Sequence, residues 1–198
     1  MNILFLGYDT FDTELIEYLE ADGNIVKHIP AHLKIYPSDI VDIDLIISYG
    51  YKCIIKKDII NKFKNKIINL HISLLPRNRG MYPNLWSALE DTISGVSIHY
   101  IDEGIDTGDI LTQRLGGKFM PSDTLKTSYM RLRHLLEWHF MFKWHDIKAG
   151  KIKSRKQDER YSSYHTKQEG EALFHLLGDE FWDCKVSTLR ERAKNDKK

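Results

Sequence analysis

The chain has 198 residues and a mass of 23.2 kDa, which is enough for one well-buried domain with a small addition but not for two domains of full size. Its 42% hydrophobic and 29% charged residues are typical of a globular protein, and a formal net charge of +1 gives no general reason to expect a nucleic acid as partner. The two cysteines, Cys53 and Cys184, form no C-x-x-C pair, which argues against a disulfide framework and a thiolate zinc site.

The first ten residues, MNILFLGYDT, are apolar over only a few positions and lead directly into turn-forming residues. A signal peptide needs a basic start and a longer apolar run. No stretch of the sequence approaches the roughly 18 apolar residues of a membrane span. We therefore expect a cytoplasmic protein that does not associate with a membrane.

Short apolar runs typical of β-strands recur along the first half of the chain, with helical patterns after the first and third of them. This alternation predicts an α/β fold with a doubly wound, mostly parallel, Rossmann-like sheet. The turn after the first strand, LGYDTFDT, has a single glycine, so the G-x-G-x-x-G fingerprint of a dinucleotide site is absent. The predicted strands cover residues 3–7, 24–29, 44–50, 66–71 and 95–100.

The second half begins with the pattern of one long helix from Ser122 to about Gly150. Within it, WHFMFKWHD looks like a metal or aromatic box, but we expect its two histidines, His139 and His145, to be partly exposed. The residues that we interpret as packing surface are Trp138, Phe140, Met141 and Trp144. A basic, turn-rich stretch and one or two short helices follow. We expect one main domain over residues 1–150 and a short C-terminal segment over residues 151–198.

The first stretch that suggests chemistry is NLHISLLPRNRG, residues 69–80. Asn69 and His71 are two positions apart at the end of a predicted strand, so both project to the same side. In an open α/β sheet, ligands bind at that edge. The alternative is that Asn69 caps a turn and His71 is a hydrogen-bonded core residue.

The second stretch is SIHYIDEGIDTGDI, residues 97–110, whose loop has more acids and glycines than a simple turn needs. A carboxylate beside an imidazole relays protons, and an amide N–H stabilises an oxyanion. Asn69, His71 and Asp106 thus suit addition of a nucleophile to a carbonyl without a covalent enzyme intermediate. A metal site with His71 and His99 is the alternative, but their spacing fits no zinc signature, so we expect no metal and interpret His99 as buried or supporting.

Taken together, the motifs N-x-H-x-S-L-L-P and D-x-G-x-D-x-G closely resemble the catalytic core of enzymes that transfer a formyl group from 10-formyltetrahydrofolate. The resemblance covers roughly residues 1–125. It implies the formyltransferase fold and attack by a free amine on the formyl carbon. By the same resemblance Asn69 holds the oxyanion, His71 assists it or accepts the proton, and Asp106 orients His71.

The resemblance also implies where the folate lies, against the loop after the third strand and the Asp-rich loop. The cofactor-binding residues expected from it are Tyr51, Cys53, Ile55, Ile101, Asp102 and Gly104. It makes Cys53 a neighbour of the folate and not a nucleophile.

The acceptor amine is inferred by comparing this sequence with the motifs of the different subgroups of the family. GYDTFD lacks the Gly-Ser-Asn phosphate loop of glycinamide ribonucleotide formyltransferases, and the chain ends before the C-terminal barrel of methionyl-tRNA formyltransferases. The stretches RGMYPNLWSALEDT and SSYHTKQ together resemble the enzymes that formylate a nucleotide-linked 3- or 4-amino dideoxy sugar. The resemblance implies thymidine diphosphate as the nucleotide and a role in surface polysaccharides such as the lipopolysaccharide O-antigen. The expected substrate-binding residues are Arg77, Arg79, Tyr82, Trp86, Tyr164, His165 and Lys167.

Two questions remain open at this point, the role of two arginines and the class of function. Arg77 and Arg79 are either anion-binding groups or solvated loop charges. The protein is either a sugar-modifying enzyme or one that acts on methionyl-tRNA, and a non-catalytic folate or nucleotide-sugar binding module on the same fold is the third class. Because many relatives are dimers, the resemblance also implies a homodimer. It makes residues 1–150 the catalytic domain and residues 151–198 a segment that binds the sugar nucleotide or forms the dimer.

Overall fold

The computed structural model describes residues 1–196, which divide into two compact units. Unit 1 contains Met1–His71, Ile98–Thr112 and Glu137–Lys156, and unit 2 contains Ile72–Ser97, Gln113–Leu136 and the described residues from Gln157 onward. Residues 151–156 therefore belong with the N-terminal strands. The expected role of residues 151–198 in substrate binding or dimerisation stays a prediction.

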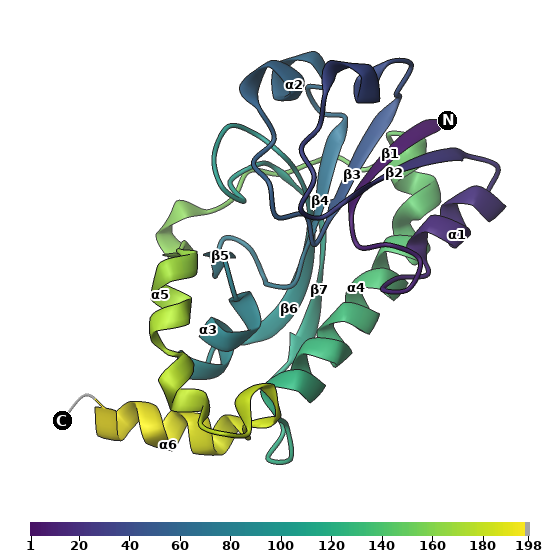
Figure 1. The fold of residues 1–198 in the computed structure, drawn as a ribbon. Helices are drawn as coiled ribbons and strands as arrows, with labels where there is room; N and C mark the ends of the chain where they lie inside the picture. The colour runs from purple at the N-terminus through teal and green to yellow at the C-terminus, as the bar shows by residue number, and fades with distance from the viewer. Residues whose placement is uncertain (197–198) are drawn as a thin grey trace. The chain divides into compact units, whose positions relative to one another are not determined.

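Within the described residues, six strands form one sheet in the order β2-β1-β3-β4-β6-β7 (Figure 1). Strand β1 (Asn2–Gly7) pairs in parallel with both β2 (Ile25–Pro30) and β3 (Leu45–Tyr49), and β3 pairs in parallel with β4 (Ile67–His71). The strand order thus reverses at β1, which is the doubly wound arrangement that the alternating pattern predicts.

The apolar runs explain which strands are central. All five residues of β3 are buried, as are five of the six in β1, because a parallel strand covered on both faces needs apolar side chains on both. Strand β2 lies at the edge and alternates between exposed and covered positions, with Ile25 73% exposed. Strands β6 (Ser94–Tyr100) and β7 (Ile110–Gly117) complete the sheet, and β7 is a strand that we did not predict.

In unit 1, helix α1 (Leu15–Ala21) packs against the last turns of the long helix α4 (Leu125–Lys148). The Asp22 carboxylate accepts hydrogen bonds from Trp144 Nε1 and Lys148 Nζ, both at 2.8 Å, and the Lys148 contact holds the pKa of Asp22 well below its usual range. Trp144 and Phe140 are fully buried, as their interpretation as packing surface requires, whereas Trp138 is 47% exposed and was predicted wrongly. His139 was expected to be partly exposed and is in fact buried, with Nε2 2.9 Å from Thr112 Oγ1.

Unit 2 is held by a separate apolar cluster. Helix α3 (Pro83–Leu89) packs on α6 (Val186–Asp196), and Leu85, Leu177 and Leu189 are almost completely buried between the elements of this unit. The two-residue strands β5 (Arg79–Gly80) and β8 (Tyr164–His165) pair in parallel. The other helices of the chain are α2 (Lys57–Lys62) and α5 (Lys167–Ala172), and short 3₁₀ turns cover Pro37–Ile40, Glu159–Tyr161, Phe174–Leu177 and Phe181–Asp183.

An ion pair in unit 2 gives a prediction about stability. The Asp123 carboxylate is buried and accepts two hydrogen bonds from Arg131, at 2.7 and 2.8 Å, and one from the backbone N–H of Met120. The Arg131 contact lowers the pKa of Asp123 in the folded protein. Asp123→Asn should therefore reduce the free energy of unfolding at pH 7 by about 2 kcal/mol, because it removes a charged acceptor from donors that stay in place.

The pH dependence of this loss has a defined sign. A carboxyl whose pKa is lowered by folding stabilises the native state above its unfolded pKa of about 3.9, and that stabilisation disappears as the pH falls through the folded pKa. Urea unfolding of the two proteins should therefore differ most near neutral pH and converge in acid. Asp183→Asn is the matched control, because its carboxylate is 64% exposed. A gap that did not change with pH would contradict the assignment.

Candidate active site

Strand β4 brings two of the predicted catalytic side chains to one edge of the sheet. Its residues Ile67, Ile68 and Leu70 are buried core, whereas Asn69 and His71 lie on the opposite side of the strand from Ile68 and Leu70. His71 is 7% exposed and Asn69 is half-buried. The strand therefore places an amide and an imidazole together, as their spacing predicts.

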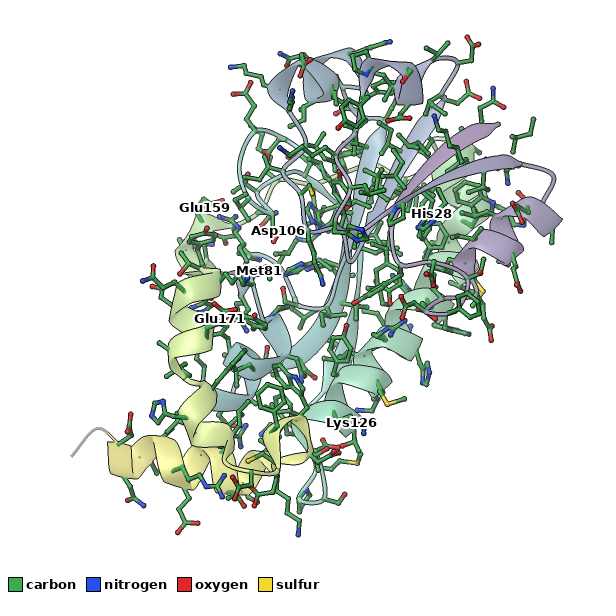
Figure 2. The ribbon with its side chains drawn as sticks, in the orientation of Figure 1. His28, Met81, Asp106, Lys126, Glu159 and Glu171 are labelled. Carbon is green, nitrogen blue, oxygen red and sulfur yellow. The ribbon has the colours of Figure 1, made fainter. Side chains whose placement is uncertain are left out.

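The loop that follows β6 holds the third predicted residue, Asp106 (labelled in Figure 2). Its backbone has a φ of 54°, in the left-handed region that non-glycine residues seldom occupy. The Asp102 carboxylate stabilises the loop, since Oδ1 accepts hydrogen bonds from Gly104 N at 3.1 Å and Thr107 Oγ1 at 2.5 Å. Gly104 leaves the room for this contact, because a Cβ there would lie 2.1 Å from Thr107 Oγ1.

The side chains of Asn69, His71, His99 and Asp106 converge within unit 1. Asn69 Nδ2 lies 3.2 Å from Asp106 Oδ1 and 3.2 Å from His99 Nε2. The other carboxylate oxygen, Asp106 Oδ2, lies 3.6 Å from His71 Nδ1. One carboxylate thus contacts both the amide and the first imidazole, and its side chain is only 13% exposed.

This arrangement supplies the groups needed for addition to a carbonyl. An amide N–H is a donor for a developing oxyanion, and an imidazole oriented by a carboxylate accepts or delivers a proton. The low exposure of these side chains strengthens such interactions, since little water competes with them. Sequence patterns predicted three of the four residues, whereas the direct contact of His99 with Asn69 was not predicted.

The residues expected to contact the folate also belong to unit 1. Ile55 is buried in the core cluster and Ile101 packs against it, so both side chains form part of the core of unit 1. The Tyr51 hydroxyl donates to Leu33 O at 2.7 Å, and burial raises the pKa of Tyr51 to about 12. Cys53 is half-buried, with Sγ 3.9 Å from Ala31 O. Their contact with folate stays a prediction.

In unit 2 the structure shows that Arg79 is a buried residue and not a solvated loop charge. Its guanidinium makes paired contacts with the Glu159 carboxylate, at 2.7 and 3.0 Å, and with Gln157 Oε1, at 2.7 and 3.1 Å. The Arg79 contact lowers the pKa of Glu159, whose side chain is 67% exposed (labelled in Figure 2). The guanidinium thus ties strand β5 to the chain that precedes β8.

The other expected substrate-binding residues fall into packed and exposed groups. Trp86 stacks on His165 at a ring distance of 3.8 Å, and burial lowers the pKa of His165 while the neighbouring Glu90 acts in the opposite direction. Tyr82 packs against Phe174. The exposed residues expected to bind substrate are Arg77, Tyr164 and Lys167.

Two further observations concern the described part of the chain. Residues 1–196 contain no helix that is long and apolar enough to cross a membrane. Over the same residues, no group of three or more His, Cys, Asp or Glu side chains is arranged to hold a metal ion.

Comparison with protein families and curated proteins gives consistent matches. Residues 34–142, more than half of the chain, match the family described as Formyl transferase. A methionyl-tRNA formyltransferase from Fusobacterium nucleatum is 30% identical over 200 residues, which covers 83% of this chain and 64% of that protein. Another from Hydrogenovibrio crunogenus is 34% identical over 77% of this chain and 46% of its own length. The chain therefore spans less than two thirds of the length of these relatives.

Among solved structures, the formyltransferase PseJ from Anoxybacillus kamchatkensis is 42% identical to the chain, with a TM-score of 0.89. The match covers 98% of this chain and 100% of PseJ, which was crystallised with UDP-4,6-dideoxy-4-formamido-L-AltNAc and tetrahydrofolate. An N-formyltransferase from Helicobacter canadensis, in complex with folinic acid and dTDP-3-aminofucose, is 24% identical with a TM-score of 0.71 over 84% of this chain and 71% of its own. At that identity the likeness concerns the fold.

Proposed function

The chain belongs to the formyl transferase family, and from this premise we propose that it transfers the formyl group of 10-formyltetrahydrofolate to the amino group of a nucleotide-linked amino sugar. The observation that carries the proposal is the convergence of Asn69, His71 and Asp106 in unit 1. Both motifs of the resemblance meet at this one site. A site for addition to a carbonyl, in a member of this family, supports formyl transfer over a binding role alone.

The proposed reaction needs no covalent bond to the protein. The nitrogen of the acceptor amine attacks the formyl carbon, the new C–N bond forms, and the carbonyl oxygen becomes an oxyanion that an Asn69 N–H stabilises. The bond between the formyl carbon and the folate nitrogen then breaks. His71 accepts the proton that the amine loses and returns a proton to the folate nitrogen, while Asp106 stabilises the charged imidazole.

For the acceptor we propose a UDP-linked 4-amino-4,6-dideoxy sugar. The ligands in the PseJ structure are a 4-formamido sugar nucleotide and tetrahydrofolate, which are the two products that formylation of a 4-amino sugar would leave. The match to PseJ extends over all of that chain at 42% identity. The similarity to PseJ therefore favours uridine diphosphate over the thymidine diphosphate expected from the sequence.

A second candidate is formylation of methionyl-tRNA, which the curated relatives favour by name. Transfer RNA binding is dominated by contacts to phosphates and normally requires a basic face. The formal net charge of +1 offers no general excess of positive charge for that purpose. We therefore rank this candidate second.

The acceptor is tested by incubating the protein with 10-formyltetrahydrofolate and each acceptor in turn, followed by mass spectrometry for an added CO. The acceptors are UDP-linked 4-amino, dTDP-linked 4-amino and dTDP-linked 3-amino dideoxy sugars, and methionyl-tRNA. Formylation of the UDP-linked sugar is expected to be fastest. Preference for methionyl-tRNA would replace this proposal by the second candidate, and folate binding without transfer to any acceptor would indicate a binding module.

A prediction about the anionic part of the substrate follows from unit 2. Because Glu159 and Gln157 already engage Arg79, we propose that exposed Arg77 contacts the diphosphate. Arg77→Ala should raise KM for the sugar nucleotide about tenfold to a hundredfold, the loss expected for one charge-assisted hydrogen bond of about 1.5–3 kcal/mol. The value of kcat should change little.

Arg160→Ala is the matched control for this variant. The guanidinium carbons of Arg77 and Arg160 both lie 5.6 Å from the centre of the Tyr161 ring, but Arg160 is paired with Asp158. A KM that rose equally in both variants would show that Tyr161 packing, and not phosphate contact, is what Arg77 supplies.

A further inference from the structure

His99 is a buried histidine that the proposed reaction does not use directly. It lies near the end of β6, is 1% exposed, and has polar contacts at both ring nitrogens. Nδ1 lies 2.7 Å from the backbone carbonyl oxygen of Tyr100, and Nε2 lies 3.2 Å from Asn69 Nδ2. The ring therefore connects the main chain of the Asp-rich segment to the amide proposed to hold the oxyanion.

The first contact determines where the ring proton resides. A carbonyl oxygen only accepts, so a separation of 2.7 Å requires that Nδ1 carries a proton and donates it to Tyr100 O. In the neutral ring Nε2 is then an acceptor. Gly108 leaves room for Tyr100 O in this position, because a Cβ on Gly108 would lie 1.9 Å from it.

The second contact determines how the Asn69 amide is turned. Its two neighbours at 3.2 Å, His99 Nε2 and Asp106 Oδ1, are both acceptors in this state. A flipped amide would place an oxygen against two acceptors, which is unfavourable for a group with little solvent access. The NH₂ group therefore faces both of them. His99 Nε2 lies 3.5 Å from Asp106 Oδ1, so the Asn69 amide and not a direct hydrogen bond links these two residues.

We infer that His99 is a positioning residue, which acts as the Nδ1–H tautomer and turns the Asn69 N–H groups into the direction the reaction needs. This inference rests on the proposed formyl transfer. Of the two N–H contacts, the one to the neutral His99 nitrogen is weaker than the one to the Asp106 carboxylate, so the His99 contact is the one that an oxyanion can replace at lower cost. His99 thus holds the amide ready before the reaction and does not itself touch the reacting atoms.

Two substitutions separate the contacts of the ring. His99→Gln keeps a polar group that reaches the Nε2 position and can accept from Asn69, whereas His99→Asn keeps only the donor near Tyr100 O. We expect His99→Asn to lower kcat about ten- to a hundredfold, the cost seen when residues that orient metal-binding histidines are removed. His99→Gln should retain most of the activity, and KM for both substrates should be unchanged in each variant.

His139 provides a matched control, since it is also buried and contacts Thr112 through Nε2. His139→Asn and His139→Gln should leave the kcat of the folded enzyme unchanged. If His99→Asn and His99→Gln lost activity equally, or if the His139 variants lost as much, the role of His99 would be structural and the inference would be wrong.

Nuclear magnetic resonance tests the inference without any catalysis. In protein labelled with nitrogen-15, the His99 ring should show a protonated Nδ1 and an unprotonated Nε2, and the Asn69 side-chain amide signals should shift in His99→Asn but much less in His99→Gln. A ring protonated on Nε2 would overturn the inference even in an active enzyme. An inactive wild-type protein with the expected spectrum would instead refute the proposed function and leave the positioning contact in place.

Discussion

Asp106→Asn should lower kcat by about 10²- to 10⁴-fold, the range typical of removing an acid–base group, while the protein stays folded. The substitution preserves shape but removes the charge beside His71 Nδ1, at 3.6 Å, and replaces one of the two acceptors of the Asn69 amide. The imidazolium that forms when the amine loses its proton would then lose the counter-charge that Asp106 supplies. The loss should appear in kcat far more than in KM, because the charge develops during the reaction.

Glu103→Gln is the control for this prediction. It removes a carboxylate from the same loop, but this one is 55% exposed and paired with Lys57 at the surface. Steady-state kinetics and circular dichroism of both variants make the comparison. Wild-type turnover in a folded Asp106→Asn protein would rule out the proposed role of this carboxylate.

Asn69→Ala should lower kcat by about 10²- to 10³-fold, the cost of removing one oxyanion donor. It also removes the group that links His99 to Asp106. Because the formyl oxygen carries a full charge only after attack, binding of 10-formyltetrahydrofolate should be almost unaffected. Equilibrium binding and single-turnover rates with the same preparation separate the two effects.

Asn84→Ala gives a matched control for loss of a buried amide. Asn84 Nδ2 donates to Leu125 O at 3.0 Å and to Ser128 Oγ at 3.1 Å, so its loss should reduce stability but not the turnover of the folded fraction. A kcat for Asn69→Ala within a factor of three of the wild-type value would contradict the oxyanion role.

The sequence predicted the central strands well because their signal is local. All five residues of β3 are buried and most are apolar, so this strand can be recognised from its own sequence alone. Strand β7 was missed, because most of its positions are partly or fully exposed and it ends in two glycines. Exposure of His139 was also predicted wrongly. The ring is buried and contacts Thr112, which is 27 residues away in the sequence, so the helical pattern alone could not reveal it.

In the candidate site, too, features with a local sequence signal could be predicted, and features that depend on distant residues could not. Asn69 and His71 could be predicted together because a spacing of two on a strand puts them on one side. The proton on His99 Nδ1 could not be predicted, because it follows from the position of the Tyr100 carbonyl oxygen. Arg79 shows most clearly what the sequence could not predict. Its loop suggested contact with an anionic group of the substrate, but the carboxylate that it contacts belongs to Glu159, 80 residues further along the chain.

The most direct test of formyl transfer follows the formyl carbon itself. The protein is mixed with 10-formyltetrahydrofolate labelled at that carbon and with the UDP-linked 4-amino sugar, and the fate of the label is followed by nuclear magnetic resonance. A labelled formamide should accumulate on the sugar with wild-type protein and hardly at all with Asp106→Asn. Release of the label as formate, with no formamide on the sugar, would contradict formyl transfer.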